Sequence, residues 1–182
     1  HHFPHATAPR DIGWKALAVN LSDLAAMGAA PAWITLALTL PRNDVEWLDA
    51  FIGGFMALAR RHGVALVGGD TTRGPRNLCL TIAGEVPAGQ AIRRAGALPG
   101  DDVWVSGELG GAMLALAAIE GRTTLVPDEL VPLAHRLERP EPQRARIPEV
   151  TVRQLVALRF ASDAELPGLA IKALEGKLSE DQ

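Results

Sequence analysis

The sequence contains very little cysteine and no long apolar run, and both absences limit what the chain can be. Cys79 is the single cysteine among 182 residues, so no disulfide can form within one chain, which is typical of a reducing cytoplasm. Because no run of 18 or more apolar residues occurs, we expect no membrane-spanning helix. We expect Cys79, inside the apolar run LCLTIAG, to be a buried thiol.

A large excess of one charge sign is also missing. The chain has 18 Lys and Arg against 21 Asp and Glu, a net charge of −3. This balance gives no electrostatic reason to expect nucleic acid or an anionic membrane as a partner. A hydrophobic content of 48% with 21% charged residues is typical of globular proteins. The length suits one domain with a core and is short for two.

Three common catalytic motifs do not occur. There is no Gly-x-x-x-x-Gly-Lys-Ser/Thr sequence, which excludes an ordinary P-loop. There is no Gly-x-Ser-x-Gly turn and no His-Glu-x-x-His pair. Cys79 has no reactive context visible in the sequence, so a thiol catalyst is not expected.

Hydrophobic periodicity predicts an alternation of helices and strands. This order favours an α+β fold with a mostly antiparallel sheet packed with helices. The expected helices cover residues 11–31, 43–63, 111–122 and a stretch beginning at 127, with two amphipathic helical pieces in 151–182, and the expected strands cover 32–41, 64–67, 77–87 and 102–106.

The first expected helix is apolar around nearly its whole circumference, which predicts that it is buried. Asn20, Ser22 and Asp23 stand out in it, because a buried carboxylate is costly unless it is paired or bound to a cation. Local hydrogen bonds near the helix end could also satisfy Asp23. Both interpretations are open at this stage.

The stretch LVGGDTTRGP, residues 66–75, follows the expected strand 64–67. Gly68 and Gly69 allow the backbone to approach another group closely, because neither has a Cβ. Asp70 and Arg73, with the threonines between them, suit a strand end that holds a phosphate or a metal–phosphate complex. A polar hairpin turn is the alternative. Carboxylates around Mg²⁺ with arginines such as Arg94 are what phosphoryl transfer requires, although spacing alone does not bring these residues together.

Three blocks resemble bacterial thiamine-monophosphate kinase: KALAVNLSDLAAMGAAPAWITLALTLP, GGDTTRGP and RAGALPGDDVWVSG. They occur in the family's order across roughly residues 1–146. The family belongs to a superfamily with aminoimidazole ribonucleotide synthetase and selenophosphate synthetase, so the resemblance implies the fold of that synthetase's N-terminal domain. We expect a partial ATP- and Mg-binding α/β domain over residues 1–90, the start of a second α/β domain over 91–149 and a helical tail of unassigned origin over 150–182.

The resemblance also implies site residues. Asp23 and Asp70 would ligate the Mg²⁺ ions that carry the ATP phosphates, Gly69, Asp70 and Arg94 would contact the nucleotide, and His2 would contact thiamine phosphate. The implied reaction is phosphorylation of thiamine phosphate by ATP to thiamine diphosphate, in a cytoplasmic homodimer that pairs through its N-terminal sheet. The attacking phosphate oxygen is already anionic near neutral pH, because the second pKa of a monoester is about 6. No catalytic side chain is therefore expected.

Two pieces of the family's pattern are absent. The sequence begins at the last two residues of an acidic run that ends in His-Phe, and no Asp-x-Ser-Asp-Gly motif occurs. The pattern therefore predicts a chain truncated at its N-terminus and without the C-terminal domain, with impaired binding of Mg-ATP and impaired turnover. The alternatives are a related ATP-dependent synthetase of the same superfamily and a non-catalytic oligomerisation remnant.

Overall fold

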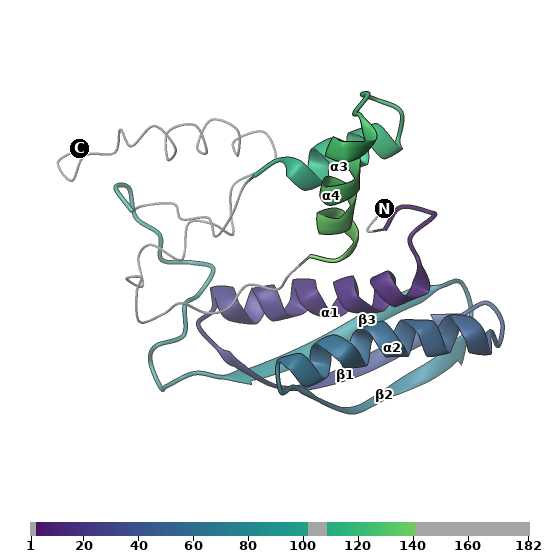
Figure 1. Cartoon of the computed structure of the whole chain (residues 1–182). Helices are drawn as coiled ribbons and strands as arrows, with labels where there is room; N and C mark the ends of the chain where they lie inside the picture. Colours follow the sequence, from purple (N-terminus) through teal and green to yellow (C-terminus); the bar gives the residue numbers. More distant parts are fainter. Residues whose placement is uncertain (1–2, 102–108, 141–182) are drawn as a thin grey trace.

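In the computed structural model, which describes residues 3–101 and 109–140, two long helices cover one face of a sheet and a helical hairpin lies beside them (Figure 1). The helices and strands follow one another in the order α1 (Pro9–Ala26), β1 (Ala30–Leu40), α2 (Val45–Arg61), β2 (Ala65–Arg73), β3 (Asn77–Glu85), α3 (Gly111–Ile119) and α4 (Pro127–Glu138). The α+β class expected from the sequence is confirmed. The domain boundaries at residues 90 and 149 stay predictions.

The sheet has the strand order β2-β1-β3 and is mixed. β1 pairs in parallel with β2 and antiparallel with β3. The prediction of a mostly antiparallel sheet is therefore wrong for one of these two pairings. The physical reason is that α2 carries the chain back across the sheet, so that β2 starts in the same direction as β1. Residues 74–76 then cross the end of β1, where the Gly74 amide donates to the Leu40 carbonyl at 2.9 Å.

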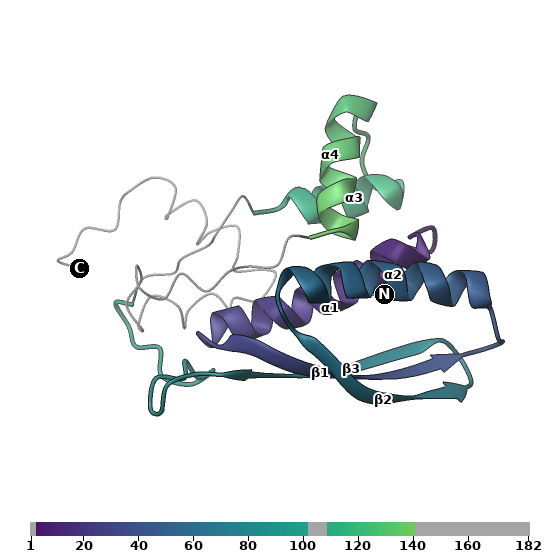
Figure 2. The same cartoon turned by 60° about the horizontal axis from the view of Figure 1, so that its bottom comes forward.

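The core lies between the sheet and the two helices on its single covered face, an arrangement that both views show (Figure 2). Successive strand residues point to opposite faces, so alternate positions of β1, from Ile34 to Leu40, are buried while Ala37 is exposed. α2 contributes Phe51 and Phe55, both fully buried, and their rings stack at 6.2 Å between centroids. The apolar periodicity of the sequence predicts this face correctly.

Two glycines let α1 and α2 pack with their backbones in contact. A Cβ added at Gly54 would overlap the carbonyl oxygen of Arg10, and one added at Gly13 would overlap the carbonyl oxygen of Phe51. Neither helix could approach the other so closely with larger side chains at these positions. The first helix is therefore buried as expected, by a contact that its periodicity alone does not show.

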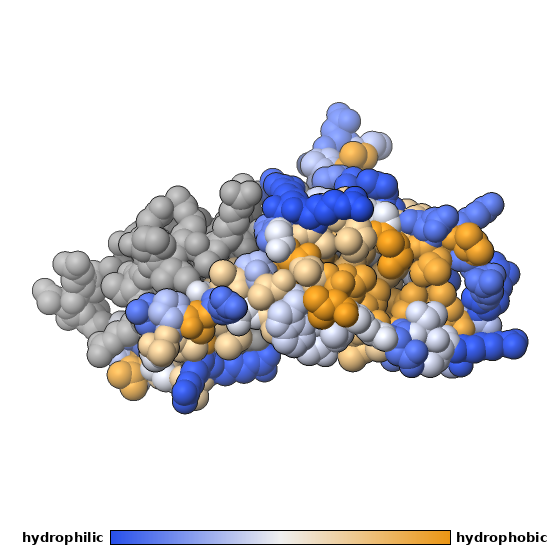
Figure 3. Space-filling view, turned by 90° about the horizontal axis from the view of Figure 1, so that it is seen from below, coloured by the Kyte–Doolittle hydropathy of each residue, from blue (hydrophilic) through white to orange (hydrophobic). Residues whose placement is uncertain are grey.

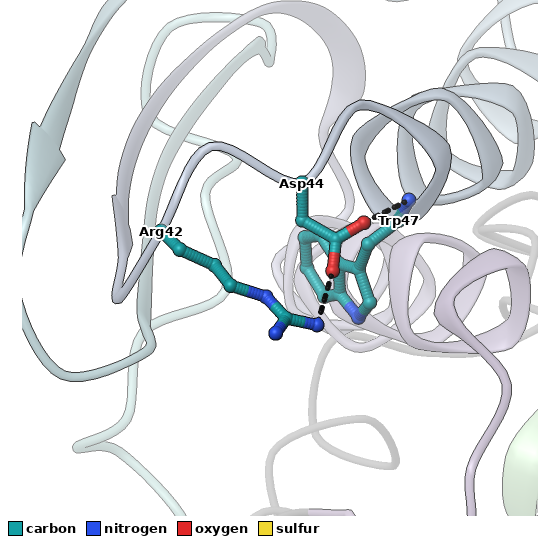
Figure 4. Close-up of polar contacts among 3 residues, drawn as sticks. All are labelled: Arg42, Asp44 and Trp47. Carbon is teal, nitrogen blue, oxygen red and sulfur yellow. Dashed lines mark hydrogen bonds and ion pairs between the residues drawn. The ribbon is translucent and has the colours of Figure 1, made fainter.

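The ends of the first two helices follow their local signals. α1 ends at Ala26 and Gly28 has a φ of +75°, a conformation that favours glycine. We expected Pro31, together with Gly28, to end this helix. Pro31 instead lies inside β1. The sequence offers Asn43 or Asp44 as the cap of α2, and Asp44 is the one that caps it: its carboxylate accepts from the Trp47 amide at 3.1 Å and also from the Arg42 guanidinium at 3.1 Å (Figure 4).

β2 is longer than the sequence predicts. It continues through Gly68 and Gly69 to Arg73, paired with β1 along its length apart from an irregularity between Ile34 and Thr35. Asp70 therefore lies within a strand, opposite Ala37, and neither at a strand end nor in a hairpin turn. Glycine has a low strand propensity, so the pairing with β1 is what keeps Gly68 and Gly69 in an extended strand.

The prediction that Cys79 is buried is also wrong, because its side chain is exposed. Cys79 pairs with Ala37 of β1, on the sheet face that the helices do not cover. Its neighbours Leu78 and Leu80 pack against the core instead. An apolar strand is thus buried on one face only here.

The hairpin of α3 and α4 contacts α1 through Arg139 and Pro140, the two residues that follow α4. The Trp14 indole donates from Nε1 to the Pro140 carbonyl at 3.0 Å, and the Arg139 guanidinium lies 5.0 Å from the Trp14 ring centroid. The two predicted helices are confirmed; α3 ends at Ile119, three residues before its predicted end, and α4 ends at Glu138. The strand expected at 102–106 and the helical pieces expected in 151–182 lie outside the described residues. Among the helices that are described, none is long and apolar enough to cross a membrane.

Candidate functional site

A cavity of about 610 Å³ lies between the edge strand β2 and helix α2. It contains two of the residues that the sequence singles out, Gly69 and Asp70. An apolar floor beside a rim of glycine, carboxylate and hydroxyl groups suits a ligand with one apolar and one polar part. The cavity is lined by Leu36, Leu38, Leu48, Ile52, Leu66, Val67, Gly68, Gly69, Asp70 and Thr71.

Gly69 is required by the sheet itself. Its φ of +149° is one that residues with a side chain rarely adopt, and an added Cβ would overlap the Leu36 carbonyl oxygen. The close approach that the sequence suggested is thus an approach to β1. The nucleotide contact implied for Gly69 is not needed to explain why glycine stands there.

Asp70 is one of the residues that line the cavity, and its pairing with Ala37 places it on the sheet face that the helices do not cover. The residue is exposed, and its Oδ1 accepts from the Thr71 amide at 2.8 Å. Two residues along the strand, the Thr72 hydroxyl is 3.0 Å from the Thr39 hydroxyl of β1. An exposed carboxylate with hydroxyls nearby is the kind of oxygen donor set that Mg²⁺ prefers, with several waters retained.

Asp23 and Arg94 belong to a second region, at the C-terminal end of α1. Asp23 lies in the last turn of α1 and is exposed, so the expectation of a buried carboxylate is wrong. The segment that carries Arg94 is held at the same end, because the Ile92 amide donates to the Met27 carbonyl at 3.1 Å. The structure therefore places these two predicted residues at one end of one helix.

The two regions are separated along the sheet. The last turn of α1 adjoins the start of β1, where the Ala29 amide donates to the Leu24 carbonyl. Asp70 lies opposite Ala37, seven residues after Ala30, which is about 23 Å at the usual rise of a strand. Among the residues that the structure describes, no group of three or more His, Cys, Asp and Glu could hold a metal ion. His2 lies outside the described residues.

The sequence places Lys15 on one helix face with Asp23, but sequence reasoning did not predict that Lys15 is half-buried. Burial lowers the pKa of Lys15, an effect that the nearby Glu138 carboxylate opposes. The Lys15 ammonium lies 5.4 Å from the Phe3 ring centroid, and Phe3 directly follows His2 in the sequence. A lysine within an otherwise apolar helix is the signal that could have found it.

Comparisons with known proteins place this arrangement in a family. Residues 1–86 match the family model of the AIR synthase related protein, N-terminal domain. Thiamine-monophosphate kinase from Salmonella typhimurium is 52% identical over 122 residues, covering 67% of this chain and 38% of that protein. A second family model, of a family of unknown function (DUF6526), matches residues 133–182, the part for which the sequence indicated no relative beyond residue 150.

Solved structures agree with the sequence comparisons. The crystal structure of thiamine-monophosphate kinase from Stenotrophomonas maltophilia matches with a TM-score of 0.71 and 50% identity, over 87% of this chain and 48% of that one. The structure of AaThiL complexed with AMPPCP and TMP matches with a TM-score of 0.68 and 31% identity, over 77% and 45%.

The fold and these matches indicate the class first: residues 1–86 of this chain are similar to the N-terminal domain of the AIR synthase related family. Within that class the chain is a homologue of the thiamine-monophosphate kinases, as the three sequence blocks predict. It spans 38% of the length of the Salmonella relative.

Proposed function

We propose that this protein takes part in the ATP-dependent phosphorylation of thiamine phosphate to thiamine diphosphate. The observation that carries the proposal is the 52% identity to a thiamine-monophosphate kinase over 122 residues. The complex of AaThiL with AMPPCP and TMP supports ATP and thiamine phosphate as the two substrates. AMPPCP is a nonhydrolysable analogue whose phosphates stand in for those of ATP.

The chain's own residues would bind and orient the substrates. Asp70, at the rim of the cavity, and Asp23 would each hold Mg²⁺, Gly69, Asp70 and Arg94 would lie against the nucleotide, and His2 would contact thiamine phosphate. Mg²⁺ would supply charge neutralisation between two phosphate groups that otherwise repel each other. The attacking oxygen needs no general base, so binding and alignment are the main tasks of the protein.

The separation of the two carboxylates favours action as a homodimer. Asp23 lies in the last turn of α1, beside the start of β1, whereas Asp70 lies opposite Ala37 further along that strand, so we propose that the two carboxylates at one ATP come from different copies. The uncovered sheet face supports such pairing: Trp33 is 42% exposed there, and Figure 3 shows apolar side chains gathered on the side seen from below. We propose that two copies meet through this face.

The test is Mg²⁺-dependent ATP binding by calorimetry, together with a chromatographic assay for thiamine diphosphate. We expect binding that requires Mg²⁺ and weakens at least about tenfold in Asp70→Asn and in Asp23→Asn, while Asp49→Asn, a change at an exposed aspartate of α2, leaves it unaltered. We expect turnover to be slow, because the Asp-x-Ser-Asp-Gly motif is absent from this sequence.

A non-catalytic oligomerisation module is the second candidate. It is favoured by the lack, among the described residues, of any cluster of three or more metal-ligating side chains. If ATP does not bind with or without Mg²⁺ while the protein still forms dimers, the kinase proposal fails and this second candidate is supported.

A further inference from the structure

The buried hydroxyl of Thr7 has its hydrogen-bond partner on the helical hairpin. Thr7 belongs to residues 3–8, which precede α1 and which we call the N-terminal segment, and it is only 6% exposed. A buried hydroxyl is costly unless it is hydrogen-bonded. The Thr7 hydroxyl donates to Oε1 of Glu138 in a long hydrogen bond of 3.5 Å, although 131 positions separate the two residues. Because Glu138 is the last residue of α4, the N-terminal segment and the hairpin meet at this carboxylate (Figure 1).

Lys15 of α1 interacts with the same two parts of the molecule. Its half-buried ammonium lies 5.4 Å from the ring centroid of Phe3, the first described residue of the N-terminal segment. Burial lowers the pKa of Lys15, and the nearby Glu138 carboxylate opposes that effect. An opposite charge stabilises a cation that has lost part of its water. Glu138 therefore acts on Lys15 as well as on the Thr7 hydroxyl.

The N-terminal segment is held at both of its ends. Phe3 packs against the hydrophobic core and lies under the Lys15 ammonium. At the other end, the Thr7 amide donates to the Pro4 carbonyl at 3.1 Å and closes a turn. The protection of this turn against exchange can therefore report on the contact between Thr7 and Glu138.

The contacts of Glu138 are separate from the attachment of α4 to α1. Arg139 follows Glu138, lies over the ring of Trp14 at 5.0 Å and pairs with Asp11 at 3.1 Å, and both of these partners belong to α1. Thr7 precedes α1. The end of α4 is thus held on α1 by one set of contacts and on the N-terminal segment by another.

We propose that Glu138 couples the N-terminal segment to the hairpin, so that residues 3–8 and α4 open and close as one conformational unit. Opening of either part separates Glu138 from Thr7 and Lys15, so the other part then loses the stabilisation that these contacts give it. A ligand that holds one part closed would also hold the other closed, because such coupling is reciprocal. The proposal does not depend on the kinase function.

Amide exchange of the full-length chain tests the coupling. In Glu138→Ala we expect exchange to rise about fivefold both within residues 127–138 and at the Thr7 amide, because one carboxylate serves both parts. The matched control is Asp128→Ala, at an exposed carboxylate in the first turn of the same helix, which should leave the Thr7 amide unchanged. Exchange within β1 reports whether each variant keeps the core of the fold.

The reciprocal variant is Thr7→Val, which removes the hydroxyl and keeps the size of the side chain. It should raise exchange within residues 127–138 by a similar factor, whereas Thr7→Ser, which keeps the hydroxyl, should not. In the double variant Thr7→Val/Glu138→Ala, exchange within α4 should match that of Glu138→Ala alone, because the same contact can be lost only once.

Three results would overturn the proposal. The first is faster exchange of α4 in Glu138→Ala with the Thr7 amide and β1 unchanged. The second is exchange of α4 in Thr7→Val equal to that of the parent. The third is a double variant in which the two single effects multiply, since independent parts behave in that way. If Glu138→Ala also raises exchange within β1, Thr7→Val decides by itself.

Discussion

The Arg139 guanidinium lies over the ring of Trp14, 5.0 Å from its centroid, with its Nε 3.1 Å from Oδ1 of Asp11. Arg139 directly follows α4, whereas Trp14 and Asp11 belong to the first turns of α1. The residues are separated by more than 120 positions in the sequence. This contact attaches the helical hairpin to the helices that cover the sheet.

We expect Arg139→Ala to loosen α4 without unfolding the rest of the protein. Loss of a cation–π contact and a partly exposed ion pair costs about 1 kcal/mol, which corresponds to about fivefold faster amide exchange in residues 127–138. Arg93→Ala, at an exposed arginine in the loop after β3, is the control. Equal amide exchange of α4 in the two variants would contradict a stabilising role for the contacts of Arg139 with Trp14 and Asp11.

The neighbouring glycines Gly53 and Gly54 of α2 should respond in opposite directions to alanine. Gly54→Ala places a Cβ on the Arg10 carbonyl oxygen and should destabilise the protein by about 3 kcal/mol. At Gly53 the nearest atom to an added Cβ is Nη1 of Arg10 at 3.7 Å, an ordinary contact. Gly53→Ala should therefore stabilise by about 0.5–1 kcal/mol, as alanine does in helices. Urea unfolding of both variants measures the difference.

Alanine substitutions at Gly68 and Gly69 test whether Gly69 is needed for the structure of the sheet, independently of any ligand contact. Gly69→Ala would push β2 away from the Leu36 carbonyl and should lower the free energy of unfolding by about 2 kcal/mol or more. Gly68→Ala should have a small effect, because an added Cβ would meet only the Thr35 methyl carbon at 4.0 Å. Thermal unfolding without nucleotide is the measurement. An unchanged melting temperature for Gly69→Ala would show that β2 can move there at little cost.

Asp44 should make stability depend on pH. Its pKa is lowered by the hydrogen bond from the Trp47 amide and then by Arg42. Because the folded-state pKa lies below the unfolded value of about 3.9, the ionised form contributes stability above that value and loses it as pH falls through the folded-state pKa. Asp44→Asn should thus be less stable than the parent at pH 7, and the difference in stability should shrink as the pH falls through the folded-state pKa of Asp44. Asp49→Asn controls for loss of charge on α2, and a gap independent of pH would contradict the assignment.

A charge on the uncovered sheet face should weaken the proposed dimer. Trp33→Glu should raise the dissociation constant at least about tenfold, because a buried carboxylate would replace an aromatic contact. Val45→Glu, also at an exposed apolar residue but in the first turn of α2, is the control. Light scattering over a dilution series measures the dimer fraction. The same fraction in both variants would place the interface elsewhere.

Local signals in the sequence determined the order of the elements and the family. The cap of α2 at Asn43 or Asp44, the end of α1 near Gly28 and the strand over residues 32–41 depend on neighbours within a few residues, so they could be predicted. The three sequence blocks likewise pointed to the kinases that the comparisons then matched. The roles of Asp23, Asp70, Arg94 and His2 stay predictions.

Only the tertiary structure decided how the strands pair and which groups meet. Whether β2 stops at Val67 or continues to Arg73 depends on pairing with β1, a strand more than 20 residues away, and Cys79 is exposed because both long helices cover the other face. The distance of Asp70 from Asp23 follows from the same pairing. Backbone hydrogen bonds between distant strands, and the burial of one sheet face by helices, are non-local, so no window of the sequence contains them.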